Sequence, residues 1–386
     1  MAYNRKQRLN DNIKAIETAF ILDREQRTPT ARERLLLERY CGFGGLKCIL
    51  NPARELADAV HWAKSDLELF APTVELHRLI RENSKNESEY KQLMDSLKQS
   101  VLTAFYTPSA VTEALTDVLK EHQIIPEKVL EPSAGIGAFV DSVLDNNPKA
   151  DIMAFEKDLL TGKILRHLHP EQKVRIEGFE KIEKPFNDYF DLAISNIPFG
   201  DVAVFDPSYT AMKGMRALVT RRIHNYFFVK ALDTVRDGGL VAFITSQGVL
   251  NAKNNSAARF MMLYHADLVS AIRLPNNLFT ENANTEVGSD LIILQKNTQK
   301  ESLRGDDNLL DTVYNDENRI PTNNYFQEHP ERIIHTTAKL DTDPFGKPAM
   351  IYTHEDGVEG IAEDLRRMLH EDFKKNLNLN RYLGIE

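Results

Sequence analysis

The sequence contains little cysteine and no long apolar run. Cys41 and Cys48 are the only two cysteines, and neither has His or Cys partners at the spacing of zinc ligands. A zinc ribbon and a disulfide framework are therefore excluded, and we predict no metal site. The N-terminus lacks the apolar core of a signal peptide, and no stretch reaches the ~18 apolar residues of a membrane span. We therefore expect a cytoplasmic protein without a membrane segment.

An excess of positive charge is also absent. The 48 Lys and Arg residues are outnumbered by 57 Asp and Glu residues, which gives a net charge of −9 over 386 residues. Phosphate attraction needs a positive surface, so this balance excludes a nonspecific nucleic-acid coat but allows a local basic cleft. Hydrophobic residues make up 42% and charged residues 27%, which is typical of a folded chain that buries a core without metal or disulfides.

The spacing of apolar residues divides the chain into three parts. Residues 1–100 form a helical N-terminal region, residues 101–297 alternate short apolar runs with helical stretches, and residues 298–386 form a polar, irregular tail with a helix at 360–377. In the first part, the pattern predicts helices at 11–22, 31–40, 51–69 and 74–97, with Thr30 as an N-cap of the second.

The middle part predicts the fold class. Its strand candidates are residues 128–131, 151–156, 173–177, 190–195, 240–245, 268–274 and 290–295. Helical stretches separate most of them, and strands that alternate with helices form βαβ units with parallel pairing. We therefore predict an α/β protein with a seven-stranded, doubly wound, mainly parallel sheet of Rossmann-like type, in which the last two strands form a hairpin-like pair.

A glycine-containing turn follows the first predicted strand. In VLEPSAGIGAFVDSVL (129–144) the strand ends at Glu131, and Gly135 and Gly137 precede an apolar helix. Glycine allows a ligand to approach the backbone closely, and open α/β sheets bind ligands at the carboxyl ends of their strands. The turn matches neither the P-loop pattern nor GxGxxG. A ligand-binding turn and a plain strand–helix turn are both compatible with it.

An acidic residue ends the second predicted strand. Glu156 follows the glycine turn by about 20 residues, and a carboxylate at this point can accept hydrogen bonds from both hydroxyls of a ribose. A solvated charge at a strand end is the alternative. The spacing favours a nucleoside ligand.

The fourth predicted strand runs into Asn196-Ile197-Pro198-Phe199. The Asn196 side-chain carbonyl and the Ile197 backbone carbonyl would be two clustered acceptors, able to hold a planar NH2 group. Phe199 would offer a face on which a flat ring can stack. An Asx-type turn that closes a strand is the alternative interpretation.

A basic cluster lies in the long loop behind this tetrapeptide. It comprises Lys213, Arg216, Arg221 and Arg222. Phosphate contacts and a solvated loop are both compatible with these residues.

Together these segments resemble the S-adenosylmethionine-dependent N6-adenine DNA methyltransferases. A Phe-Tyr-Thr-Pro segment at 105–108, the glycine turn, the acidic end of the second strand and the Asn-x-Pro-Phe tetrapeptide occur in the family's order over residues 101–297. Residues 224–251 and 274–296 resemble the parts that follow the catalytic loop. The segments YCGFGGL (40–46), NIPFGD (196–201) and NNYFQEHPE (323–331) are similar to the methylase module of large helicase–methylase proteins of phages and mobile elements.

The resemblance implies a role for each matching residue. Asn196 and the Ile197 carbonyl would hold the target amino group in a loop stiffened by Pro198, and Phe199 would stack on the base. Ile197 stands where the family usually has a second proline, so the rigidity of the loop changes while the acceptor is kept. The residues implied in binding the methyl donor S-adenosylmethionine are Phe105, Tyr106, Thr107, Glu131, Ser133, Gly135, Gly137, Phe139, Glu156, Phe179 and Glu180.

The resemblance favours a site-specific adenine DNA methyltransferase of the kind found in restriction–modification, with DNA as partner. A helicase or specificity module in the same or another chain is also expected. Two alternatives stay open. A protein-glutamine or RNA amino-group methyltransferase would use the same fold and cofactor, since an amide NH2 is planar too. A catalytically weak DNA-binding module would fit the acidic charge and Ile197.

Overall fold

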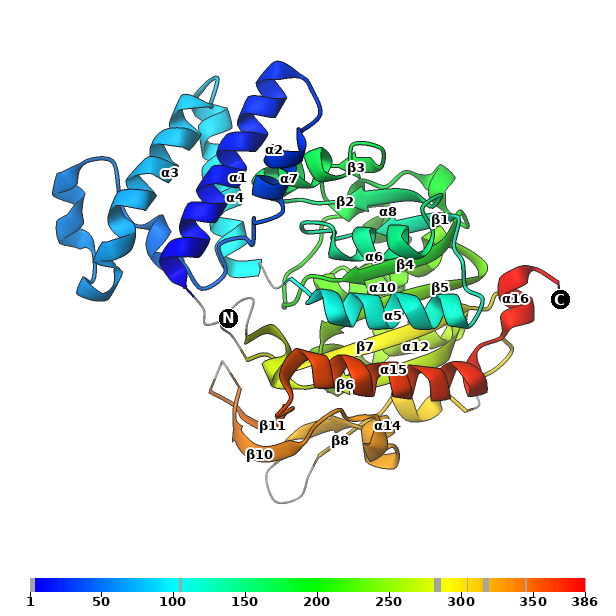
Figure 1. Ribbon diagram of the computed structural model, residues 1–386. Helices are drawn as coiled ribbons and strands as arrows, with labels where there is room; N and C mark the ends of the chain where they lie inside the picture. Colours follow the sequence, from blue (N-terminus) through cyan, green and yellow to red (C-terminus); the bar gives the residue numbers. More distant parts are fainter. Residues whose placement is uncertain are drawn as a thin grey trace.

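The computed structural model centres on one seven-stranded sheet (Figure 1). It describes residues 4–103, 106–280, 286–303, 305–314, 319–343 and 346–385. The strands are β1 (Lys128–Glu131), β2 (Asp151–Phe155), β3 (Lys173–Arg175), β4 (Phe190–Asn196), β5 (Val235–Ser246), β6 (Ala266–Leu274) and β7 (Ser289–Lys296). Their spatial order is β3-β2-β1-β4-β5-β7-β6, and only β7 pairs antiparallel with its neighbours. The predicted doubly wound, mainly parallel sheet is confirmed.

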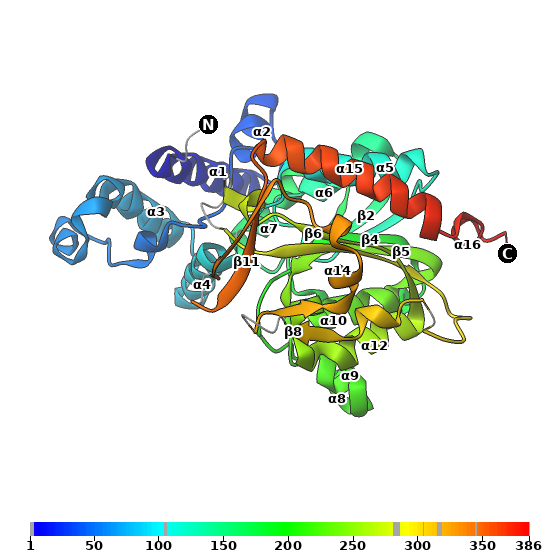
Figure 2. The ribbon, with the colours of Figure 1, turned by 90° about the horizontal axis from the view of Figure 1, so that it is seen from below.

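Helices cover both faces of the sheet (Figure 2). One face carries α5 (Ser109–Glu121), α6 (Ala138–Asn146) and α15 (Gly357–Asn376), and the other carries α10 (Ile223–Thr234) and α12 (Ser256–His265). Each strand of the sheet interior is apolar on both sides, as expected of parallel strands covered by helices. The sheet therefore separates two buried clusters, one under α5 and α15 and one under α10 and α12.

The N-terminal region is helical and packs on α7 (Leu159–Leu168), the helix after β2. Its helices are α1 (Arg5–Glu25), α2 (Ala31–Leu37), α3 (Phe70–Glu82) and α4 (Glu87–Thr103). Thr30 is the predicted N-cap of α2 and forms a capping box with Glu33. Apolar side chains of α1 and α4 share one buried cluster with α7, and Asp23 of α1 pairs with Lys163 of α7.

Two of the predicted helices in this region are wrong in detail. Residues 51–69 form the short 3₁₀ turns Leu56–His61 and Lys64–Leu69 instead of one α-helix, and the first of these turns has no buried residue, with Leu56 86% exposed. The helix predicted at 74–97 is split into α3 and α4. Asn83 ends α3, and the Asn86 side chain accepts from the backbone N–H of Glu89 at the start of α4. Asn side chains favour such caps over helix interiors.

The tail contains elements that the sequence pattern did not predict. Two antiparallel hairpins, β8 (Thr312–Tyr314) with β9 (Pro321–Asn323) and β10 (Thr337–Thr342) with β11 (Pro348–Thr353), precede the expected helix α15. Shorter helices are α8 (Pro207–Met212), α9 (Gly214–Val219), α11 (Gly248–Asn251), α14 (Asn324–Glu328) and α16 (Leu379–Leu383). In the described part of the chain, no helix combines the length and apolarity that crossing a membrane requires.

A buried ion pair joins the two hairpin-like strands at the end of the sheet. Arg273 of β6 donates to both carboxylate oxygens of Asp290 in β7, at 2.9 and 3.1 Å, and the two side chains are 3% and 0% exposed. The same guanidinium donates to Asn251 and lies over the Phe326 ring of the tail. Arg273 therefore connects the sheet, the segment after β5 and the tail.

Removal of the carboxylate should destabilise the protein strongly. We expect Asp290→Asn to lower the free energy of unfolding by about 3 kcal/mol or more, because it leaves the Arg273 charge buried without its counter-ion. Glu82→Gln, in the exposed Arg78–Glu82 pair, should leave it nearly unchanged. Urea denaturation followed by circular dichroism measures both variants, and equal effects of the two substitutions would contradict the prediction.

Candidate active site

The predicted segments meet at one edge of the sheet. In β1, β2, β4 and β5, which run parallel, the carboxyl ends lie at the same edge. β1 lies between β2 and β4, so the turn after Glu131 has Glu156 on one side and Asn196 on the other. The tetrapeptide thus follows the strand directly beside the glycine turn.

The glycine turn uses backbone geometry that other residues rarely adopt. Gly135 and Gly137 have φ angles of +56° and +94°, and Gly137 is the N-cap of α6. A Cβ atom at Gly135 would lie 2.8 Å from Cε1 of Tyr106, whose ring covers the turn. At Gly137 it would lie 2.6 Å from Nε2 of His169. Both positions therefore require glycine, because the φ angles are positive and because neighbouring side chains leave no room for a Cβ atom.

Glu156 connects this turn to the segment that follows β2. Its Oε2 accepts from the backbone N–H of Gly135 at 2.8 Å, and its Oε1 accepts from that of Asp158 at 2.7 Å. Desolvation, with a contribution from the nearby Asp158 charge, raises the pKa of Glu156 to about 8. A carboxylate has about four acceptor positions, so Glu156 retains acceptor capacity for further donors. The two backbone bonds fix the direction of these positions.

Glu131 is a second enclosed carboxyl at the same edge. Its side chain is 2% exposed, and burial raises its pKa to about 8, offset in part by Ser195 and by the Ser133 backbone. The Ser133 N–H donates to Oε1 of Glu131 at 3.1 Å. Phe139 is buried in the core behind the turn. Because Ser195 precedes Asn196, its position beside Glu131 brings the end of β4 against the glycine turn.

The tetrapeptide is anchored by Ile197. The Ile197 N–H donates to the carbonyl of Ile244 in β5 at 3.0 Å, and its side chain is 1% exposed in the core. Asn196, Pro198 and Phe199 are partly exposed around this anchor. The rings of Phe199 and Phe279 meet edge to face, with centroids 6.3 Å apart.

The other predicted cofactor residues are distributed unevenly. Thr107 lies at this edge, and its hydroxyl is buried without a hydrogen-bond partner in the part of the chain that the structure describes. Tyr106 covers the glycine turn, whereas Phe105 lies outside the described residues. Phe179 is 1% exposed and packs among Phe155, Tyr226 and Phe227, so its side chain lies in the core. Glu180 lies 3.8 Å from the Lys157 ammonium.

The structure separates the basic cluster into two pairs. Arg216 donates to both carboxylate oxygens of Asp233. Asp233 lies near the C-terminal end of α10, which leads into β5, so this pair is at the edge of the sheet opposite to the carboxyl ends of the parallel strands. Lys213, between α8 and α9, is exposed three residues from this pair. Arg222 lies instead at the carboxyl edge, 3.4 Å from Asp201 and 3.2 Å from Asn255, and Arg221 is exposed beside it.

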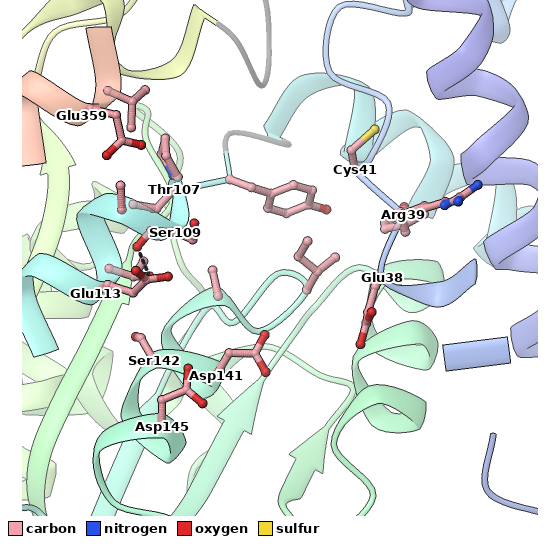
Figure 3. A pocket seen from close by; sticks show the side chains of 18 residues that line it. Glu38, Arg39, Cys41, Thr107, Ser109, Glu113, Asp141, Ser142, Asp145 and Glu359 are labelled. Carbon is pink, nitrogen blue, oxygen red and sulfur yellow. Dashed lines mark hydrogen bonds between the residues drawn. The ribbon is translucent and has the colours of Figure 1, made fainter. Parts of the chain in front are cut away.

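A pocket of about 500 Å³ opens between α5, α6 and the loop at 38–41 (Figure 3). Thr107 lines it, but Glu131, Glu156 and Asn196 do not. Carboxylates from four separate elements project around it, namely Glu38, Glu113, Asp141, Asp145 and Glu359. This lining repels phosphates, so nucleic acid has no electrostatic reason to enter on this side.

Sequence reasoning missed Asp158, which caps α7 and donates its backbone N–H to Glu156. The signal was available, because Asp directly before an apolar helical pattern is a typical N-cap. Among the described residues, no group of three or more His, Cys, Asp and Glu side chains is placed to hold a metal ion.

Curated proteins with similar sequences include a phage protein and a bacterial methyltransferase. The chain is 29% identical over 201 residues to defense against restriction protein B of Escherichia phage P1, covering 50% of this chain and 8% of that protein. It is 25% identical over 173 residues to the type II methyltransferase M.XamI of Xanthomonas campestris pv. amaranthicola, covering 42% of this chain and 33% of the relative. The chain therefore spans much less than the length of either relative.

Similar solved structures include two from restriction–modification systems, at low sequence identity. The DNA-bound type ISP restriction–modification enzyme LlaBIII matches 96% of this chain and 28% of its own, with 12% identity and a TM-score of 0.44. A chain of a type I restriction–modification system matches 76% of this chain and 70% of its own, with 13% identity and a TM-score of 0.43. Likeness at this level says nothing about substrate.

The family model adds a match over most of the chain. The model described as N-6 DNA methylase matches residues 88–352, which include the whole seven-stranded sheet, the glycine turn and the tetrapeptide. This chain is therefore a methyltransferase that belongs to the N-6 DNA methylase family.

Proposed function

We propose that the protein transfers a methyl group from S-adenosylmethionine to the N6 amino group of adenine in DNA. The observation that carries this proposal is the adjacency of two loops at one sheet edge. The Asn196–Phe199 tetrapeptide ends β4, and the glycine turn with Glu131 ends the neighbouring strand β1. An acceptor site for an amino group would thereby lie beside a nucleoside site.

The residues at the β1 and β2 ends suit this methyl donor. Glu156 retains acceptor capacity for ribose hydroxyls, and the backbone N–H groups of Gly135 and Asp158 hold its carboxylate in place. The buried Thr107 hydroxyl offers a donor toward a polar group of the ligand, and the glycine turn allows close approach. The donor's sulfonium methyl group supplies the chemical reactivity, and the protein supplies position.

The tetrapeptide would position the acceptor nitrogen. The adenine amino nitrogen is a weak nucleophile because its lone pair is delocalised into the ring. The Asn196 side-chain carbonyl and the Ile197 backbone carbonyl would accept its two N–H groups and direct the lone pair toward the methyl group. Phe199 would stack on the base. The base would leave the duplex, or the substrate would be single-stranded, because an adenine inside a helix is out of reach.

The proposal includes partners and location. Arg221 and Arg222 lie at the carboxyl edge, whereas Arg216 pairs with Asp233 at the opposite edge of the sheet, so Arg221 and Arg222 are the basic residues best placed for phosphate contacts. We further propose that a helicase or specificity module, in the same or another chain, selects the target sequence, and that the protein acts in the cytoplasm. The phage P1 relative matches over only 8% of its length, which leaves most of that protein for other modules.

Asn196 should be essential for methyl transfer. With tritium-labelled S-adenosylmethionine, we expect label in DNA, and nucleoside analysis should identify it as N6-methyladenine. Asn196→Ala should reduce the rate by about 100-fold or more, because one of two preorganised acceptors is lost. Calorimetry should show donor binding close to wild type in this variant.

The control arms use RNA and total protein as acceptors under the same conditions. Label that appears only in RNA or only in protein would contradict DNA as the substrate and identify RNA or protein as the methyl acceptor. Absence of donor binding by the wild-type protein would contradict the proposal as a whole, and full activity of Asn196→Ala would contradict the assigned amino-group site.

Donor binding should strengthen as the pH rises toward 8. Ribose hydroxyls donate to an ionised carboxylate, whereas burial raises the pKa of Glu156 to about 8, so below that pH binding has to displace a proton. With a pKa of about 8 in the free protein, we expect the wild-type dissociation constant to fall by up to about 50-fold from pH 6 to pH 8 beyond any change in Glu156→Gln. Calorimetry at both pH values measures the dissociation constants of the two proteins. Because both proteins bind the same ligand, titration of the ligand affects them equally and cancels in the comparison. Parallel pH profiles of the two proteins would contradict the assignment.

A further inference from the structure

Asp158 controls how the Glu156 carboxylate is held. The Asp158 backbone N–H donates to Oε1 of Glu156 at 2.7 Å, and its own carboxylate caps α7 by accepting from the Thr161 N–H at 2.8 Å. Glu156 in turn accepts from the Gly135 N–H of the glycine turn. A shift of Asp158 would therefore change the direction of the acceptor positions that Glu156 presents.

A serine from the N-terminal region completes this arrangement. Ser96 lies on α4, is 5% exposed, and donates its hydroxyl to Oδ1 of Asp158 at 2.7 Å. The same hydroxyl oxygen accepts from the backbone N–H of Leu160 at 3.0 Å. Ser96 thus makes two contacts with the turn between β2 and α7, although it is 62 residues from Asp158 in the chain.

The contact matters because Asp158 is buried. Desolvation raises the pKa of Asp158, and hydrogen bonds from Thr161, Ser96 and Leu160 counteract that rise by stabilising the ionised form. Hydrogen bonds to an ionised acceptor are stronger than neutral ones. Loss of the Ser96 hydroxyl would remove the hydrogen bond by which α4 fixes the Asp158 carboxylate.

We propose that Ser96 is a positioning residue for the methyl donor, acting through Asp158 on the ribose-facing carboxylate of Glu156. The inference rests on the proposed function, which assigns Glu156 to the ribose. It gives the helical N-terminal region a direct part in the donor site: α4 sets the geometry of a carboxylate that it does not itself touch. The donor contact belongs to Glu156, and Ser96 determines how well that contact forms.

The chain offers a matched control on the same helix. Ser100 lies one turn beyond Ser96 on α4, is 3% exposed, and accepts from the backbone N–H of Phe43 at 3.1 Å. That bond stays within the N-terminal region, as does the hydrogen bond between the Ser100 and Tyr40 side chains. Ser96→Ala and Ser100→Ala therefore each delete one buried, hydrogen-bonded hydroxyl, and only the first deletes a contact to Asp158.

The test measures donor binding and kinetics on the full chain. Ser96→Ala should raise the dissociation constant and the KM for S-adenosylmethionine by about tenfold with kcat within about twofold of wild type, as expected for a lost charge-assisted hydrogen bond. Ser100→Ala should leave these constants near wild type. In a Glu156→Gln background, Ser96→Ala should add little, because the carboxylate it orients is gone.

Three measurements keep the inference and the proposed function distinguishable. No donor binding by wild type would overturn the proposed function. With wild-type binding intact, equal constants for Ser96→Ala and Ser100→Ala would overturn the inference, as would an effect of Ser96→Ala undiminished in Glu156→Gln. Thermal unfolding checks that each variant folds, and Ser96→Cys, which keeps the buried volume with a weak donor, replaces an alanine variant that does not fold. It should also weaken donor binding, and wild-type affinity would overturn the inference.

Discussion

The Glu156 carboxylate is the point at which three parts of the structure meet. One oxygen accepts from Gly135 in the turn after β1, and the other accepts from Asp158, which starts α7 after β2. Through Asp158 and Ser96 the same group is connected to α4 of the N-terminal region. A partly buried carboxyl is costly unless hydrogen bonds satisfy it, so the packing of these parts and the orientation of Glu156 depend on each other.

Ile197 shows how one loop can be held by different means. Proline in this place would fix φ but would carry no N–H. Here the Ile197 N–H donates to Ile244 of β5, and the buried side chain adds a hydrophobic anchor. A proline could not make that bond. The rigidity lost with the proline ring is thus replaced by a backbone hydrogen bond and by burial, and the carbonyl that the proposed function needs is retained.

Local sequence patterns predicted the sheet well because its strands are short apolar runs that alternate with amphipathic helices. They also indicated both glycines of the turn, and the glycine residue type permits the positive φ angles found there. Contacts between distant residues carry no such local signal. Arg216 pairs with a residue 17 positions later, Ser96 with one 62 positions later, and neither partner follows from spacing. The resemblance implies that Phe179 contacts the donor, but its packing against three aromatic rings places the side chain in the core.

The distribution of charge indicates on which side of the site each ligand of the proposed reaction would bind. A chain with a net charge of −9 attracts phosphates only where basic residues dominate locally. Carboxylates surround the pocket beside α5 and α6, whereas Arg221 and Arg222 stand where the loop after β4 returns to the carboxyl edge. DNA would then approach from the β4–β5 side and the methyl donor would occupy the β1–β2 side. Asn196 ends the strand between these two sides, so the amino group and the methyl group could meet only at the tetrapeptide.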